Sequence, residues 1–234
     1  GIYCSNVGSA GCVFYTADLA SLRATAELAV RVREDRPDIN VLINNAGVYC
    51  PERKLSTDGF EMSFAVNYLA PFLLTTELLD VLQKNSPSRI VNVTSIAYRN
   101  AVIPYDDLNW EKSYNGWKAY KASKLALVLF TFMLARRLEG SYVTANCLHP
   151  GAVDTKMLRS VSPDTRGVSI QEGAVNSIML ATSLNVQGAS GLYFENQSAV
   201  EASPAARDLV EQEKLWRLSE KLVAPYRLQQ KKPA

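Results

Sequence analysis

The sequence has little of what a metal centre or a disulfide framework requires. It contains one histidine, His149, and four cysteines, none of which form a closely spaced CxxC pair. A zinc site needs several histidine or cysteine ligands, so we expect no metal site. Reduced, structural cysteines are the expected alternative.

Charge of one sign and long apolar runs are also scarce. The 25 basic and 23 acidic residues leave a net charge of +2, and the only concentrated basic stretch is Lys231 with Lys232, so we expect no nucleic-acid partner. No uninterrupted apolar run reaches the roughly 18 residues of a membrane span, and the first residues lack a secretory signal pattern. We therefore expect an intracellular protein, either cytoplasmic or on the cytosolic face of a membrane.

Length and apolar pattern predict one α/β domain over residues 1–234. The chain is 47% hydrophobic, and short apolar segments alternate with longer segments of helical period, which is typical of a parallel sheet covered by helices. The expected strands are residues 11–16, 41–44, 89–94, 143–148 and 191–194. The expected helices are residues 19–35, 58–84, 115–138 and 169–182, with a final helix at 203–222 that Ser203 caps and Pro204 opens, while residues 151–168 are expected to form a mobile loop.

Two Tyr-x-x-x-Lys pairs occur at or near the start of the third expected helix, Tyr114 with Lys118 and Tyr120 with Lys124. Residues four apart lie on one helical face, so spacing does not choose between the pairs. Small residues and a long apolar segment surround Tyr120, whereas Tyr114 precedes a glycine near the helix start, where glycine is better tolerated than in the interior. This context favours Tyr120 and Lys124.

A tyrosine beside a lysine is a plausible general acid or base. The phenol has an ordinary pKa near 10, and a neighbouring ammonium would lower that pKa toward neutral pH by stabilising the phenolate. Ser95 follows the expected strand 89–94, and ligands of open α/β sheets bind at the carboxyl ends of strands. Its hydroxyl would hold a substrate oxygen beside the phenol.

Five groups of residues resemble the short-chain dehydrogenase/reductase family in order and spacing. They are Asn44-Asn45-Ala46-Gly47, Asn67, Thr94-Ser95, Tyr120 to Lys124, and His149-Pro150-Gly151 with Thr155. The resemblance covers nearly the whole chain from Asp18 onward, and Ser123-Lys124-Leu125-Ala126 with the 148–151 segment is most similar to the retinol dehydrogenase branch. It implies a Rossmann-like, doubly wound parallel sheet.

The resemblance also implies a role for each matching residue. Tyr120 would be the general acid or base, Ser95 would orient the carbonyl, and Lys124 would tune Tyr120 and bind the nicotinamide ribose. Asn67 would hold a water that links Lys124 to a proton relay. The implied cofactor contacts are Asp18 to the adenine, Asn44, Ala46 and Gly47 beside the cofactor, Tyr120 and Lys124 at the ribose, Pro150 and Gly151 around the nicotinamide, and Thr155 to the carboxamide.

Several of these residues also have a plainer interpretation. Asp18 and Ser21 would cap the helix that follows, and the 44–47 segment would be an ordinary turn. His149 fits a packing or hydrogen-bonding residue better than a base. Four aromatic residues would line a substrate pocket or belong to the core and its covering: Tyr98, Tyr105, Trp110 and Trp117.

The family's glycine-rich phosphate-binding turn has no counterpart here. Gly8-Ser9-Ala10-Gly11 precedes an expected strand, whereas the family's turn follows one. The resemblance thus implies a fold truncated at its N-terminus by at least one βαβ unit, about 30 residues or more, with one side of strand 41–44 left as an open edge. A fragment or isoform, a sequence that omits residues, or a protein that replaced this unit would each account for this. We expect the chain alone to bind dinucleotide weakly, because the helix N-terminus that would hold the pyrophosphate is missing.

The leading hypothesis is an oxidoreductase that transfers a hydride between NAD(P), with NADP preferred, and a small lipophilic alcohol or carbonyl substrate of retinoid or steroid type. The resemblance further implies a homodimer or homotetramer through helices 58–84 and 115–138, and membrane association only through an N-terminal segment outside this sequence. The alternative is a catalytically silent dehydrogenase-like fragment or isoform that binds a partner. The intact set of Asn67, Ser95, Tyr120 and Lys124 favours the enzyme.

Overall fold

The computed structural model describes residues 13–162 and 164–228. Within these residues the sheet has five strands in the order β1 (Val41–Asn44), β2 (Ser88–Val93), β3 (Val143–Leu148), β4 (Tyr193–Glu195) and β5 (Ser198–Val200). The first four strands pair in parallel, and β5 is antiparallel to β4. The predicted α/β class is confirmed, and β5 is a strand that the sequence pattern missed.

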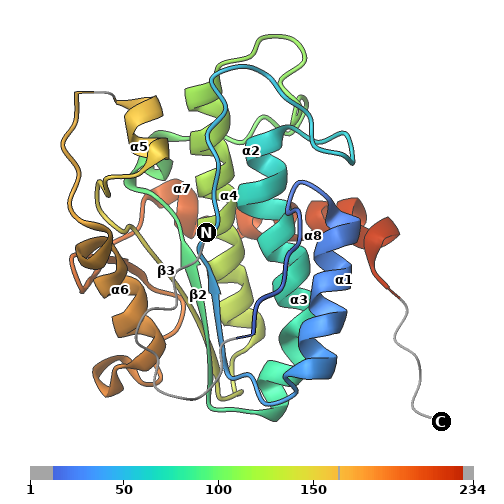
Figure 1. Ribbon diagram of the computed structural model, residues 1–234, viewed down its shortest axis with the longest axis vertical. Helices are drawn as coiled ribbons and strands as arrows, with labels where there is room; N and C mark the ends of the chain where they lie inside the picture. Colours follow the sequence, from blue (N-terminus) through green and yellow to red (C-terminus); the bar gives the residue numbers. More distant parts are fainter. Residues whose placement is uncertain (1–12, 163, 229–234) are drawn as a thin grey trace.

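Helices cover both faces of the sheet (Figure 1). α6 lies on one face, while α1, α3 and α4 lie on the other. The helical elements are α1 (Leu22–Asp35), α2 (Met62–Phe64), the π-helical segment η1 (Ala65–Leu69), α3 (Ala70–Lys84), η2 (Ile96–Asn100), α4 (Gly116–Arg137), α5 (Lys156–Val161), α6 (Ile170–Thr182), η3 (Leu184–Val186), α7 (Pro204–Arg207), α8 (Leu209–Val223) and η4 (Ala224–Tyr226). The four expected helices between residues 19 and 182 are therefore present.

The strand β2 contributes to hydrophobic clusters on both faces of the sheet. Ile90 belongs to the larger cluster, which includes residues of α3 and α4. Val91 and Val93 belong to a smaller cluster with Leu180 of α6. Successive side chains of a strand point to opposite faces, so a strand covered on both sides needs adjacent apolar residues, as in the short run of Ile90 and Val91. This is why such runs located the central strands correctly.

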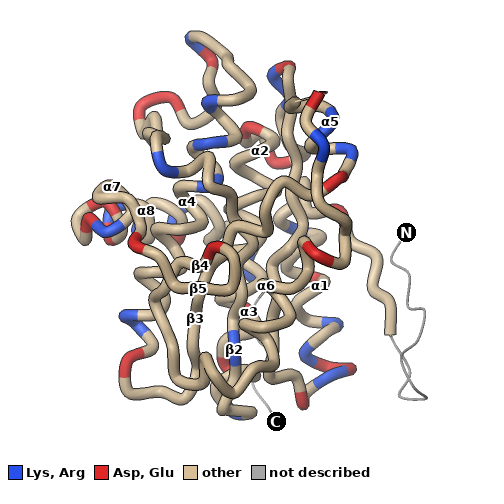
Figure 2. The backbone as a smooth tube through the Cα atoms, turned by 90° about the vertical axis from the view of Figure 1, so that its left-hand side faces the viewer, with Lys and Arg blue, Asp and Glu red and all other residues tan. Residues whose placement is uncertain are grey.

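Charged residues of both signs are interspersed on the outer helices and loops (Figure 2). Arg89 is a charged residue within β2, and its guanidinium donates hydrogen bonds to the carbonyls of Leu180 (3.0 Å) and Ser183 (2.8 Å). The C-terminal end of α6 carries partial negative charge, so this contact satisfies the cation and the helix end together.

The elements α2, η1 and α3 form one helical stretch, Met62–Lys84. This stretch of 23 residues, with a mean hydropathy of 1.3, is long and apolar enough to cross a membrane by length and composition. The criterion of an uninterrupted apolar run does not find this stretch, because polar residues such as Asn67 and Glu77 interrupt it. However, 78% of its apolar window is buried inside the protein, as in the core helix of a globular domain, so the composition alone is weak support for a membrane span.

The edge strand β1 has its apolar side chains partly uncovered on one face. It pairs with β2, and within the described residues no strand flanks its other side. Val41 and Ile43 are 37% and 40% exposed, whereas Asn44 is buried against α3. The expected open edge is thus present.

The expected first strand, residues 11–16, is not a strand where the structure describes it. Residues 13–16 have no regular secondary structure, and residues 11 and 12 lie outside the described part. A strand forms only beside a hydrogen-bonded neighbour, and the segment instead contacts α1, where the Arg31 guanidinium donates to the Thr16 carbonyl (2.9 Å) and lies over the Tyr15 ring. The apolar pattern alone could not reveal this.

Two expectations near the C-terminus also need correction. The final helix is interrupted at Asp208, whose carboxylate accepts from the Val210 and Glu211 backbone amides and starts α8 separately from α7. Ser203 precedes α7 but makes no capping hydrogen bond with its side chain. The expected loop at 151–168 contains the short helix α5.

The helices expected to pair with a second copy are largely covered within the chain. α1 packs on α3, and α8 packs on α4, where the Trp216 indole stacks on the Phe130 ring. Most residues of α4 are buried. A homodimer or homotetramer stays a prediction.

Candidate active site

Tyr120 and Lys124 lie one turn apart on the buried side of α4. The helix begins after Asn115, whose side-chain oxygen accepts a hydrogen bond from the Lys118 amide as an N-cap. Tyr120 is 7% exposed and Lys124 is 4% exposed. A buried lysine is unusual because its charge loses hydration, so its presence marks this part of α4 as a candidate site.

The carboxyl end of β2 holds Lys124 through its side chain and its main chain. The ammonium Nζ donates to the Val93 carbonyl at 3.0 Å, and the Thr94 hydroxyl donates to the Lys124 carbonyl at 3.1 Å. Burial lowers the pKa of Lys124 from its ordinary 10.5 to about 8. The ammonium has three donors, and Val93 is the acceptor found among the described residues, so the site has capacity for a further acceptor.

Ser95 lies beside the phenol of Tyr120, as predicted. It follows β2, and its hydroxyl accepts a hydrogen bond from the Ala97 amide at the start of η2 (3.3 Å). The same hydroxyl lies near enough to the Tyr120 phenol to lower the pKa of that phenol. Two hydroxyl groups thus meet at the carboxyl end of the sheet, where one substrate oxygen would contact both.

The pKa of Tyr120 differs from the sequence expectation. Burial raises this pKa above its ordinary value of 10, and the Ser95 hydroxyl counteracts only part of the effect. The Lys124 ammonium lies 5.7 Å from the ring centroid but does not lower the pKa in this state. The predicted lowering was wrong here, because loss of hydration outweighs the distant charge.

Asn67 connects the π-helical segment to α4 and to the turn after β1. Its side-chain oxygen accepts from the Val48 amide (2.7 Å), and its amide donates to the Val48 carbonyl (2.9 Å) and the Ser123 hydroxyl (2.9 Å). π-Helical insertions are frequent at functional sites because they re-aim a side chain. Asn67 therefore positions the site, and its predicted water-holding role remains a prediction.

The turn after β1 contributes unevenly to the site. The Asn44 amide donates to the Thr75 hydroxyl (2.9 Å) and to the Asn92 side-chain oxygen (2.8 Å), so its side chain faces α3 and not the site. Ala46 is exposed. Gly47 is closest to the catalytic pair, since a Cβ atom there would lie 3.4 Å from both the Asn67 oxygen and the Lys124 nitrogen.

Residues after β3 approach the same region from the other side. Pro150 is followed by Gly151 at φ 88°, a left-handed conformation that favours glycine. The Thr155 hydroxyl caps α5 by accepting from the Leu158 amide (3.2 Å). The Met157 methyl of α5 would lie 3.6 Å from a Cβ at Gly47, so α5 reaches toward the catalytic pair, which the sequence pattern did not predict.

Ser21 caps α1, whereas Asp18 accepts a hydrogen bond in the turn that precedes this helix. The Asp18 carboxylate accepts from the Ala20 amide (2.9 Å), and the Ser21 hydroxyl accepts from the Ala24 amide at the start of α1 (3.2 Å). Asp18 is exposed. The capping alternative is thus observed for Ser21 and not for Asp18, and the contact of Asp18 with the adenine remains a prediction.

The competing pair, Tyr114 and Lys118, does not form a second site. The Tyr114 hydroxyl donates to the Cys50 carbonyl at 2.7 Å and lies 3.3 Å from a Glu61 carboxylate oxygen, which helps to raise its pKa. Lys118 is exposed. The choice of Tyr120 over Tyr114 therefore agrees with the structure.

Two aromatic residues beside Tyr120 complete the site. Trp117 stacks on the Tyr120 ring, with centroids 5.6 Å apart and planes 13° apart, and Tyr49 meets the ring edge-on at 6.1 Å. The sequence pattern left Trp117 either in a substrate pocket or in the core and its covering. It did not predict the position of Tyr49, because no spacing rule connects Tyr49 to α4. Tyr98, in contrast, is fully buried against Tyr193 and belongs to the core.

His149 has a structural environment. Its backbone amide donates to the Phe194 carbonyl (2.9 Å), and its carbonyl accepts from the Asn176 side chain (3.1 Å). Burial lowers the pKa of its imidazole, which keeps the ring neutral near pH 7. These contacts agree with a strand-end role.

A parallel sheet with serine, tyrosine and lysine gathered at its carboxyl end defines a nucleotide-dependent oxidoreductase of Rossmann-like fold. The family model described as short chain dehydrogenase matches residues 4–166, and the chain belongs to this family, whose members use NAD(P). It is similar to human retinol dehydrogenase 14, with 47% identity over 219 residues that cover 88% of this chain and 65% of that protein. Human retinol dehydrogenase 13 is 42% identical, with 88% of this chain and 67% of that protein covered.

Solved structures agree with the fold. A crystal structure of an uncharacterized protein from Mycobacterium Paratuberculosis has a TM-score of 0.72 at 32% identity and covers 89% of this chain and 74% of its own. A Pseudomonas aeruginosa RhlG/NADP active-site complex has a TM-score of 0.60 at 24% identity, covering 76% and 72%, which shows the fold alone. This chain thus spans about two thirds of the curated relatives and three quarters of these structures.

Proposed function

We propose that the protein transfers a hydride between NAD(P) and a carbonyl or alcohol, and that Tyr120 is its general acid or base. The observation that carries this proposal is the meeting of the Tyr120 phenol with the Ser95 hydroxyl, beside the buried Lys124. A structural tyrosine and lysine would not need to be buried together at the carboxyl end of a parallel sheet.

Each residue has a distinct task in carbonyl reduction. The Ser95 hydroxyl donates a hydrogen bond to the carbonyl oxygen and holds it beside Tyr120. The phenol then donates its proton to that oxygen as negative charge develops there, and the reverse transfer accompanies alcohol oxidation. Lys124 would bind the nicotinamide ribose, with the Val93 carbonyl holding its ammonium and Asn67 holding the surrounding elements in place.

The residues around Lys124 fit the nicotinamide ribose. Gly47 leaves open the space that a side chain would fill, and the buried ammonium has donors available for hydroxyl oxygens. Bound NAD(P)H would supply the hydride, and NAD(P) would accept one in the opposite direction. Gly151 and Thr155 would border the nicotinamide. We propose NADP in preference to NAD, which comparative titration with NADPH and NADH tests.

We propose a lipophilic substrate of retinoid or steroid type. Its support is the 40–47% identity to retinol dehydrogenases 12, 13 and 14, together with the aromatic surroundings of Tyr120.

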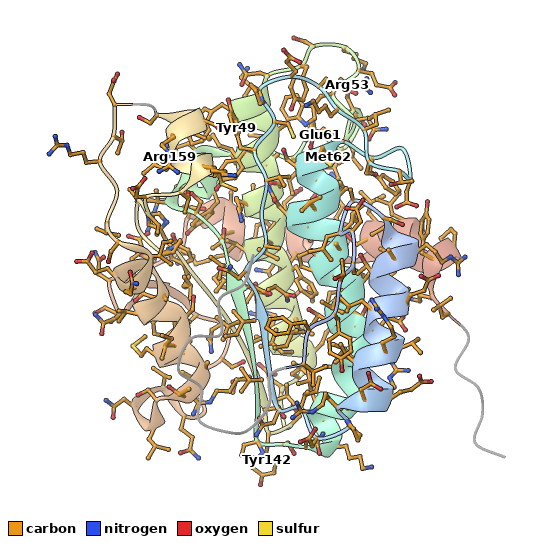
Figure 3. The ribbon with its side chains drawn as sticks, in the orientation of Figure 1. Tyr49, Arg53, Glu61, Met62, Tyr142 and Arg159 are labelled. Carbon is orange, nitrogen blue, oxygen red and sulfur yellow. The ribbon has the colours of Figure 1, made fainter. Side chains whose placement is uncertain are left out.

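Substitution of the catalytic phenol tests the proposed function. In the protein that carries this chain, Tyr120→Phe should lower kcat for aldehyde reduction by at least about 100-fold, because the proton donor is lost, while NADPH affinity changes little. Tyr142→Phe is the matched control, since Tyr142 is 79% exposed and lies at the opposite end of the molecule from Tyr49 (Figure 3). Equal turnover of Tyr120→Phe and the wild type would refute the proposal, and no turnover by either protein would favour a silent binding protein.

A further inference from the structure

The rings of Tyr49 and Trp117, which we call the aromatic wall, border the phenol of Tyr120. Trp117 lies nearly parallel to the phenol ring and Tyr49 stands at 85° to it. Trp117 precedes Tyr120 by three residues on α4, so the helix places their rings on one side. The aromatic wall is therefore in direct contact with the residue that would exchange the proton.

Three contacts fix Tyr49 beside α4. On one side of Tyr49, both backbone polar groups of Val48 bond to the Asn67 side chain. On the other side, the Cys50 carbonyl accepts from the Tyr114 hydroxyl. The same carbonyl lies so close to α4 that a Cβ at Gly116 would be only 2.2 Å away. The contacts of Val48 and Cys50 thus hold the backbone of Tyr49 in place, and they do not involve the Tyr49 ring.

The aromatic wall also has apolar surface left uncovered. Trp117 is 41% exposed, although a large aromatic ring is usually buried to a greater extent. Ile96, which directly follows Ser95, is 47% exposed. The groups that would hold a substrate oxygen are therefore bordered by uncovered apolar and aromatic surface, and a bound apolar substrate would cover it.

We infer that the aromatic wall selects flat, conjugated apolar substrates over flexible aliphatic ones, and that Trp117 is the specificity-determining residue. The inference rests on the proposed function and names the class of substrate that this site takes. A flat conjugated chain stacks on an indole face, whereas a saturated chain gains only general apolar contact. The hydroxyls of Ser95 and Tyr120 would hold the carbonyl oxygen while the aromatic wall aligns the conjugated part.

Paired substrates test the inference by separating shape from apolarity. The protein that carries this chain is assayed with cinnamaldehyde and with nonanal, a saturated aldehyde with the same number of carbons. Trp117→Ala should raise KM for cinnamaldehyde roughly tenfold and change KM for nonanal by less than about twofold, with similar kcat. Trp117→Phe should restore most of the affinity, and Tyr49→Leu should give a smaller loss with the same selectivity. Equal changes for both aldehydes, or none, would overturn the inference.

A binding measurement separates this inference from the proposed function. Cinnamaldehyde should quench tryptophan fluorescence through Trp117, so Trp117→Phe should lose most of the quenching and Trp110→Phe should keep it. Selective quenching without turnover would support the aromatic wall and contradict the proposed function. If cinnamaldehyde and nonanal bind equally, or quenching survives in Trp117→Phe, the aromatic wall is not the selective surface.

Discussion

Replacement of Lys124 by methionine should stabilise the fold even though it removes a residue of the proposed active site. The pKa of this buried lysine falls from 10.5 to about 8, which at 1.36 kcal/mol per pKa unit corresponds to about 3 kcal/mol of destabilisation by the charge at pH 7. Lys124→Met removes that cost but leaves the Val93 carbonyl without its donor, at a cost of about 1 kcal/mol. We expect a net gain of about 2 kcal/mol at pH 7.

The pH dependence distinguishes this explanation from a general packing effect. Between pH 8 and 10.5 the unfolded lysine still binds a proton that the folded one has lost, so the wild type gains stability as pH rises through this range. The advantage of Lys124→Met should therefore fall to near zero by pH 10. Urea titrations of both proteins at pH 7 and pH 10 give the free energies of unfolding.

The exposed Lys118 provides the matched control. Lys118→Met removes a lysine from the same helix and should show no comparable gain at pH 7. A Lys124→Met protein that is less stable than the wild type at pH 7, or whose advantage does not change with pH, would refute the reasoning.

Two further predictions concern the contacts that shape the site. Asn44→Ala should lower the free energy of unfolding by about 3 kcal/mol, because it leaves the buried side-chain oxygens of Thr75 and Asn92 without a donor. Urea titration measures this loss, and a loss below about 1 kcal/mol would contradict the structural role of Asn44. Gly116→Ala should lower the free energy of unfolding by about 2 kcal/mol and reduce cinnamaldehyde turnover, because the added Cβ would force the Cys50 carbonyl away from α4. A thermal unfolding curve and an activity equal to those of the wild type would exclude this close approach.

The sequence could predict the central strands and the candidate site residues because both depend on short-range patterns. Short, largely apolar segments mark strands such as β2 that are covered on both faces. Ser95 comes directly after Thr94 at the end of such a segment, and the i, i+4 spacing puts Tyr120 and Lys124 on one helical face. The parallel order of the strands then brings the two segments together.

The sequence could not predict features that depend on neighbours distant in the chain. Residues 13–16 have a strand-like composition but lie against α1. They do not form a strand, because strand pairing needs a partner strand. Asn44 faces α3 because Thr75 and Asn92 are there to accept its hydrogen bonds. Tyr49 reaches Tyr120 only through the packing of its turn against α4.

The predicted pKa of Tyr120 failed for a similar physical reason. The sequence showed that a lysine would be near, which favours a lower pKa, but it did not show how deeply both groups are buried. Burial destabilises the charged form of each side chain, so it raises the pKa of Tyr120 and lowers that of Lys124. The balance between the two effects follows from three-dimensional packing.

The most direct test of the central claim follows the hydride itself. The protein that carries this chain is incubated with cinnamaldehyde and NADPH deuterated at the C4 position of the nicotinamide, and the alcohol is analysed by mass spectrometry. We predict one deuterium on the carbinol carbon with the wild type and with Tyr142→Phe, and at least about 100-fold less labelled alcohol with Tyr120→Phe. Unlabelled alcohol from the wild type with both C4-deuterated forms of the cofactor, or equal labelling by Tyr120→Phe, would contradict the account.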